Sequence, residues 1–250
     1  AGSAGIGLAN LLCSALVEEG LTLAEAQAKV HMFDVNGLLE DSRTDLVDFQ
    51  LPYAHPHAPE QDFVAAVESI KPSTIIGVST IGGAFTKSVV EAMTLLNDRP
   101  IIMALSNPTE HAECTAEQAY TWSGGKAIFA AGVQFPPVTV NGQDFMPGQA
   151  NNFYIFPAVG MAIFATQASR VPDDLFIEAA RAVADQVPDD LLQKGLLYPP
   201  QSDILEIEIQ TAAKVAGKVF DAGLAGVPHP DDLEAFIRSH VYQPAYPSLV

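Results

Sequence analysis

Apolar residues follow two kinds of pattern over the first 150 positions of the chain. Short runs rich in Ile, Val and Ala are typical of buried strands, and they predict strands at residues 74–79, 101–105 and 127–131. Between these runs apolar positions recur at helical spacing, and Thr86 and Thr115 each stand where a helix begins. Alternating strands and helices predict the α/β class, with a Rossmann-like, doubly wound parallel sheet.

The chain opens with Ala1-Gly2-Ser3-Ala4-Gly5 and continues directly into an amphipathic helical pattern. In a dinucleotide-binding unit a strand leads into a glycine turn of the form G-x-G-x-x-G and then into a helix. Gly2 and Gly5 fit the second and third glycines, and the first would precede Ala1. We therefore expect the first strand of the sheet to be missing, and we take Gly2, Ser3, Ala4 and Gly5 as candidates for cofactor binding.

An acid closes the next apolar run, at residues 30–34. In this fold an acid at the end of that strand accepts hydrogen bonds from the adenosine ribose, which makes Asp34 a candidate cofactor ligand. Thr22 and Glu25 form a capping-box pattern for a short extra helix, which accounts for the long spacing between the glycine turn and this acid. The alternative is that Asp34 only closes a strand before the turn at residues 36–37.

Two predicted strands end in loops rich in polar residues and glycine, at residues 79–83 and 106–109. Ligands of open α/β sheets bind at such carboxyl ends, so Ser79 is a further candidate for cofactor binding. Residues 138–145 alternate around an Asn-Gly pair, which predicts a hairpin.

After residue 150 the pattern changes to helices. Apolar and amphipathic stretches predict them at residues 154–169, 173–186, 204–220 and 231–239. The tail that contains Pro244 and Pro247 is expected to lie over another surface.

Composition narrows the class of protein. Apolar residues make up 48% of the chain and charged residues 17%, which excludes a disordered chain. Twelve Lys and Arg against 30 Asp and Glu give a net charge of −18, so we expect no nucleic-acid partner. No apolar run is long enough to span a membrane, so we expect no membrane association. The two cysteines suit a reducing compartment, and we expect the cytoplasm, or the mitochondrial matrix in a eukaryote.

Several motifs resemble those of the malic enzymes. They are residues 76–79 (IGVS), 82–85 (GGAF), 104–109 (ALSNPT), 112–117 (AECTAE), 147–152 (PGQANN), 156–157 (FP) and 197–200 (LYPP). The resemblance runs in order through essentially the whole chain and implies the C-terminal half of a malic enzyme. Residues 1–151 would then form a dinucleotide-binding domain, truncated at its N-terminus. Residues 152–250 would form a helical segment that packs on the missing N-terminal half of the same polypeptide.

The resemblance implies oxidative decarboxylation of L-malate to pyruvate and carbon dioxide, with hydride transferred to a nicotinamide dinucleotide. It also implies a Mn or Mg ion that polarises the C2 oxygen, and a homodimer or homotetramer. In the family the Lys base, the Tyr acid and the three carboxylate metal ligands precede the dinucleotide motif. We therefore assign no catalytic residue and no metal ligand to this chain, and we expect it to be a fragment that is inactive alone.

Asn107 and Asn152 match substrate-contacting positions of the family. Their amides donate hydrogen bonds to a malate carboxylate without adding charge. We expect Asn107 to contact the cofactor as well, and Asn151 to support its neighbour. Judged from the residues alone, either asparagine is as readily a turn residue that bonds its own backbone.

We expect NAD rather than NADP as the cofactor. Asp34 suits the ribose 2′-hydroxyl and repels a 2′-phosphate, and Glu40 and Asp41 add negative charge. Malic enzymes that prefer NADP often carry a Lys where Gln50 lies in this sequence. Arg43 is a nearby cation and argues for the opposite preference.

Two other functions stay open: a malolactic enzyme, which shares the scaffold and releases lactate, and a non-catalytic dinucleotide-binding module. His55 and His57 have the spacing of a metal-binding pair, but no third ligand is near them in sequence, so a structural role is favoured. Cys13 is expected to be a buried apolar residue, and Cys114 is not expected to be a nucleophile, because no His is identified as its partner.

Overall fold

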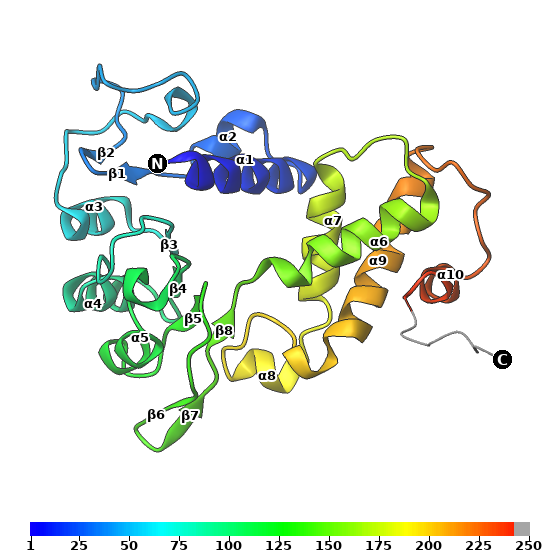
Figure 1. Cartoon of the computed structure of the whole chain (residues 1–250). Helices are drawn as coiled ribbons and strands as arrows, with labels where there is room; N and C mark the ends of the chain where they lie inside the picture. Colours follow the sequence, from blue (N-terminus) through cyan, green and yellow to red (C-terminus); the bar gives the residue numbers. More distant parts are fainter. Residues whose placement is uncertain (243–250) are drawn as a thin grey trace. The chain divides into compact units, whose positions relative to one another are not determined.

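The computed structural model describes residues 1–242 (Figure 1). Contacts divide the chain into two compact units. The first comprises Ala1–Asn151 and Pro188–Tyr198, and the second comprises Asn152–Val187 and the described residues from Pro199 onward. The sequence pattern places residues 188–198 in the helical segment, whereas the structure assigns them, with the short helix α8 (Asp189–Gln193), to the first unit. This difference arises because the end of the stretch packs against the backbone of Gly148.

A four-stranded parallel sheet forms the centre of the first unit. Its strands, in spatial order, are β3 (Thr74–Gly77), β4 (Ile101–Ala104), β5 (Ile128–Ala131) and β8 (Gly148–Gln149). The three predicted strands are confirmed with trimmed ends, and Ile75, Ile102 and Phe129 stand in register across them. The sequence pattern does not predict β8, because its two residues include a glycine and form no apolar run. The parallel sheet with flanking helices confirms the Rossmann-like α/β class.

One side of the strands is covered by helices α3 (Phe63–Ile70), α4 (Lys87–Leu96) and α5 (Ala116–Trp122) (Figure 1). Buried and half-buried residues alternate along β3 and β4, as expected when one face of a sheet is fully covered. The covered face packs Ile75 and Ile102 in one core with Met93 of α4. Thr86 and Thr115 stand at the predicted helix starts, although only the Thr115 side chain makes a capping hydrogen bond.

The first helices also form as predicted. Helix α1 spans Ser3–Glu18, and the short helix α2 spans Leu23–Gln27. The Thr22 backbone N–H donates to the Glu25 carboxylate at 2.8 Å, and the Glu25 N–H donates to the Thr22 hydroxyl at 3.2 Å. This reciprocal pair is the predicted capping box.

The predicted strand at residues 30–34 is wrong in its extent. Only β1 (Phe33–Asp34) is a strand, and it pairs antiparallel with β2 (Gly37–Leu38) outside the four-stranded sheet. Val30 instead continues the end of α2, because its N–H donates to the Gln27 carbonyl at 3.0 Å. The tight turn at Gly37, with a φ of 114°, then folds the chain back on itself.

The predicted hairpin is confirmed as β6 (Val138–Val140) and β7 (Gln143–Phe145). Its turn residues Asn141 and Gly142 both have positive φ, at 53° and 79°, which suits the twist of a two-residue hairpin. Phe145 then packs on the aromatic core beside α5.

The second unit consists of helices. They are α6 (Phe156–Thr166), α7 (Asp174–Ala184), α9 (Ile204–Asp221) and α10 (Leu233–Ser239), and α9 contacts the other three. The small side chains of Ala158, Ala162, Ala212 and Ala216 lie in the shared core, where they let α6 and α9 approach closely. All predicted helices of this part are confirmed, with shifted ends.

Four short 3₁₀ turns complete the elements of the described residues: η1 (Leu51–Tyr53), η2 (Thr109–His111), η3 (Asn152–Tyr154) and η4 (Gln201–Asp203). The prediction for Pro244 and Pro247 lies outside the described residues. Within residues 1–242, every helix is too short or too polar to cross a membrane.

Candidate functional site

The glycine turn lies at the N-terminus of α1. Gly2 is the N-cap residue, in an extended conformation and without a side-chain cap, and the first turn of the helix carries no acid. The first N–H groups of a helix have no partner within it, and together with the helix dipole they favour an anion. At Gly5 the helix passes close to the end of β3, since an added Cβ would lie 3.5 Å from Val78 Cγ2. The turn can therefore hold a phosphate beside the sheet.

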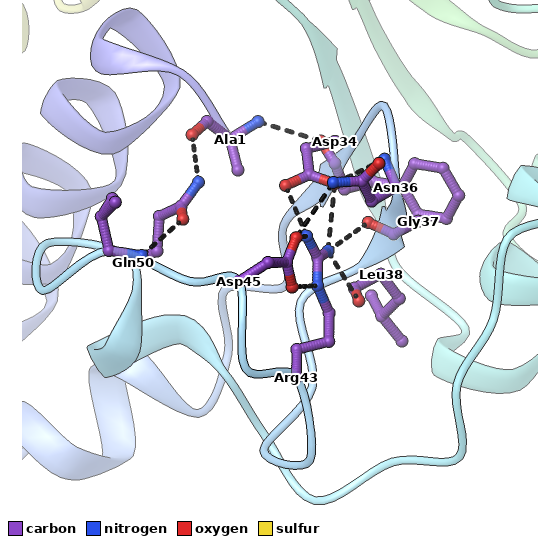
Figure 2. A network of polar contacts seen from close by, with 10 residues as sticks. Ala1, Asp34, Asn36, Gly37, Leu38, Arg43, Asp45 and Gln50 are labelled. Atoms are coloured by element: carbon purple, nitrogen blue, oxygen red, sulfur yellow. Dashed lines mark hydrogen bonds and ion pairs between the residues drawn. The ribbon is translucent and has the colours of Figure 1, made fainter.

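Two hydrogen bonds connect this turn to the segments that follow. The Ala1 backbone nitrogen donates to the Phe33 carbonyl of β1 at 2.9 Å, and the Ala1 carbonyl accepts from Gln50 Nε2 at 3.0 Å (Figure 2). Farther along, the Tyr53 hydroxyl donates to Asn10 Oδ1 on α1 at 2.7 Å. The loop that follows β2 is thus anchored along the first helix, and Gln50 lies next to the glycine turn.

Asp34 is paired with Arg43 rather than free (Figure 2). Its two carboxylate oxygens accept from Arg43 Nη1 and Nη2, both at 3.0 Å, and Oδ1 also accepts from the Asn36 N–H at 2.8 Å. A carboxylate offers about four acceptor positions, so one stays available for a ribose hydroxyl. From the sequence alone, Asp34 and Arg43 were interpreted as independent charges with opposite effects on the choice of cofactor. The structure differs from that interpretation chiefly in pairing them.

The guanidinium of Arg43 binds a second carboxylate and the turn backbone. It donates to Asp45 from Nε at 2.9 Å and from Nη2 at 2.6 Å, and to the carbonyls of Gly37 and Leu38 at 3.2 and 3.3 Å. Hydrogen bonds to both carboxylates raise the pKa of Arg43 above its ordinary value, and those from Arg43 lower the pKa of Asp45. The three charged side chains together carry a net charge of −1.

The ends of β3 and β4 meet at a buried carboxylate that sequence reasoning missed. Glu113 Oε1 accepts from the Ser79 N–H at 2.9 Å, the Ser79 hydroxyl at 2.8 Å and the Ser106 hydroxyl at 2.5 Å. The only signal in the sequence was an acid between two apolar residues, Ala112 and Cys114. The predicted cofactor residue Ser79 therefore directs both its hydroxyl and its backbone N–H to Glu113, and its role in contacting a cofactor stays a prediction.

Asn107 is exposed at the carboxyl end of β4. Its amide lies beside Gly132 at the end of β5, where an added Cβ would come within 3.1 Å of Nδ2. The structure therefore brings Asn107 and Ser79 to the same edge of the sheet, next to the Glu113 network. Asn152 is also exposed but belongs to the second unit, at the start of η3, so its joint contact with Asn107 on one substrate stays a prediction.

Other candidate residues are accounted for by local contacts. Among the described residues no group of three His, Cys, Asp or Glu is placed to hold a metal ion. His55 Nε2 lies 2.9 Å from the Val30 carbonyl, and His57 Nε2 lies 3.0 Å from the Ser69 hydroxyl. Cys13 and Cys114 are both buried, and burial raises the pKa of Cys114 to about 12. Such a thiol is a poor nucleophile.

The fold and the glycine turn together define a dinucleotide-binding α/β domain. Comparison with known proteins identifies it further: the family described as "Malic enzyme, NAD binding domain" matches residues 1–220. The chain therefore belongs to this family, and the resemblance found in its motifs is confirmed.

Full-length relatives are similar throughout the chain. It is 47% identical to NADP-dependent malic enzyme 2 of Arabidopsis thaliana over 98% of its length, and 46% identical to NADP-dependent malic enzyme of Vitis vinifera over 99%. It spans only 42% of the length of either relative.

Solved structures support the fold. The malic enzyme of Entamoeba histolytica superposes with a TM-score of 0.69 at 20% identity, over 91% of this chain and 44% of that one. The malic enzyme of Pyrococcus horikoshii gives a TM-score of 0.56 at 18% identity, over 78% and 42% of the two chains. The description of the matched family names an NAD-binding domain, but the NADP-dependent names of the plant relatives do not support the predicted preference for NAD over NADP.

Proposed function

We propose that this chain supplies the dinucleotide-binding part of a malic enzyme that converts L-malate to pyruvate and carbon dioxide. The observation that carries the proposal is the family match over residues 1–220, together with a glycine turn that lies beside the carboxyl edge of a parallel sheet. A bound nicotinamide dinucleotide would accept the hydride from C2 of malate.

The residues of this chain bind and orient the reactants. The free N–H groups of Ser3, Ala4 and Gly5 and the dipole of α1 hold the pyrophosphate. The remaining acceptor position of Asp34 takes a ribose hydroxyl. Asn107 donates its amide to the substrate carboxylate, and Asn152 is its proposed counterpart from the second unit.

The described residues do not form a metal site, and we derive no step through a metal. Following the resemblance, we place the Mn or Mg ligands, the general acid and the general base outside these 250 residues, in an N-terminal half of the same polypeptide.

NAD is the proposed preferred cofactor. Arg43, the cation closest to Asp34, is held by two carboxylates, and the cluster keeps a net negative charge that disfavours a 2′-phosphate. Gln50 adds no positive charge beside the glycine turn. The names of the plant relatives point the other way, so the ratio of kcat/KM for the two cofactors decides the matter. A clearly larger kcat/KM for NADP rejects the preference.

The activity itself is tested by product analysis. The full-length polypeptide that carries this chain, given malate, NAD and Mn, should release pyruvate and NADH in equal amounts. Lactate without net reduction of the cofactor would instead identify a malolactic enzyme.

A homodimer or homotetramer is the proposed assembly, which light scattering of the full-length polypeptide would test. The proposed compartment is the cytoplasm, or the mitochondrial matrix in a eukaryote, and the two free, buried thiols support a reducing environment. Three relatives, among them one from Flaveria trinervia, are named chloroplastic, so fluorescent tagging in the source cell is the direct test.

A further inference from the structure

Glu113 is a fully buried carboxylate at the edge of the sheet where the dinucleotide is proposed to bind. Its exposed fraction is 0%, and within residues 1–242 no Lys, Arg or His forms an ion pair with it. Hydrogen bonds from Ser79 and Ser106 satisfy Oε1, and the Ser106 N–H approaches Oε2 at 3.3 Å. Burying a carboxylate costs folding free energy unless hydrogen-bond donors surround it, and here the fold supplies those donors from the ends of two strands.

The network fixes the direction of both serine hydroxyls. The Ser79 oxygen accepts from the Ile81 N–H at 3.1 Å, and the Ser106 oxygen accepts from the Thr80 N–H at 2.9 Å. Each hydroxyl has one hydrogen, and that hydrogen points to Glu113. The Glu113 carboxylate therefore determines, through the two serines, where the backbone N–H groups of the loop that follows β3 (residues 79–83, the β3 loop) lie.

The β3 loop has a strained backbone conformation and lies very close to its neighbours. Thr80 has a φ of 58°, in the left-handed region that a branched residue rarely adopts. At Gly82 the loop touches the next loop so closely that an added Cβ would lie 2.1 Å from the Glu110 carbonyl oxygen. Gly77 in β3 likewise leaves the space that the Glu113 side chain fills, since a Cβ there would lie 2.4 Å from its Cδ.

We propose that Glu113 is a positioning residue for the dinucleotide, acting through Ser79 and Ser106 on the β3 loop. Its carboxylate is inaccessible to solvent, so it does not contact the cofactor itself. It holds residues 79–83 in the conformation that borders the cofactor at the carboxyl edge of the sheet. This inference rests on the proposed function, because that function is what places a dinucleotide at this edge.

Ser106→Ala is the sharpest test, because Ser106 is itself buried and acts only within the network. The substitution removes one donor to Glu113 and the acceptor of the Thr80 N–H. In the full-length polypeptide, calorimetric titration should show the Kd for NAD raised about tenfold, the size expected for one lost hydrogen bond to a charged group. Hydrogen exchange at the Thr80 and Ile81 amides should become faster. The KM for NAD should rise while kcat at saturating NAD changes little.

Two substitutions of Glu113 should weaken NAD binding to different degrees. Glu113→Gln keeps one oxygen for the serine donors but turns an NH₂ group toward the Ser106 N–H, so it should weaken NAD binding less than Glu113→Ala does. Ser123→Ala is the matched control. Ser123 is a buried serine that bridges the Tyr120 carbonyl and the Ala127 N–H on the amino side of β5, away from the proposed site. It should leave NAD binding unchanged.

Wild-type affinity for NAD in both Ser106→Ala and Glu113→Gln would overturn the inference, and so would equal weakening by Ser123→Ala. If Glu113→Ala does not fold, these milder variants decide the question. Failure of the unmodified protein to bind either NAD or NADP would refute the proposed function instead. Faster exchange at Thr80 and Ile81 in Ser106→Ala would still show whether the network holds the loop.

Discussion

The pairing of Arg43 with Asp34 and Asp45 makes a quantitative prediction for Arg43→Leu. The Arg43 side chain is only 10% exposed and the Asp34 side chain 17%, whereas Asp45 is 47% exposed. Leucine keeps much of the apolar stem but removes all six hydrogen bonds that the guanidinium makes to the two acids and the two carbonyls.

The size of the effect follows from burial. Removing one partner of a buried ion pair costs about 3–5 kcal/mol, while exposed pairs contribute about 0–1 kcal/mol. Because Asp34 is mostly buried and Asp45 can turn to water, we expect the free energy of unfolding of the first unit to fall by about 2–3 kcal/mol. Trp122 is the single tryptophan of the chain and lies in α5 of this unit, so its fluorescence during urea unfolding reports the change.

Lys87→Met provides the control. Lys87 also pairs with an acid in the first unit, at 3.5 Å from Glu91, but its side chain is 63% exposed. This variant should unfold at nearly the wild-type urea concentration. If Arg43→Leu also unfolds there, the Arg43 cluster does not stabilise the fold, and the reasoning from burial is refuted.

Further predictions concern substrate binding, the chain in isolation and acid stability. Asn107→Ala or Asn152→Ala in the full-length polypeptide should lower kcat/KM for malate about 10- to 100-fold, and Asp at either position should lower it further. Normal malate kinetics in both Ala variants would remove these residues from the substrate site. The isolated 250-residue chain with malate, NAD and Mn should form no pyruvate, and sustained turnover would place the acid, base and metal ligands within it. Arg43 lowers the pKa of Asp45, so the stability this pair provides should be present above about pH 4 and lost as the pH falls further. Urea midpoints measured across that range should show this loss in the wild type and less of it in Arg43→Leu.

The regular elements were predictable because their signals are local. The strands at the centre of the sheet are continuous apolar runs, the hairpin has an Asn-Gly turn, and the capping box of α2 needs only two residues three positions apart. The apolar spacing of the second unit also located its helices to within a few residues.

The contacts that shape the site were not local. The strand prediction at residues 30–34 failed because the turn at Gly37 and a helix end at Val30 determine its extent. The pairing of Asp34 with Arg43 joins residues nine positions apart through an irregular loop, and Glu113 reaches Ser79 across 34 positions. Sequence patterns identify which residues are charged, but only the fold determines which of them meet.

Hydrogen exchange of the full-length polypeptide with and without NAD tests most directly the claim that this chain binds a dinucleotide. Added NAD should slow exchange at residues 3–5, near Asp34, at residues 79–83 and at Asn107. It should leave the hairpin of β6 and β7 and helix α10 unchanged. Protection confined to the hairpin or to α10, or no protection at any concentration of NAD or NADP, would contradict the account.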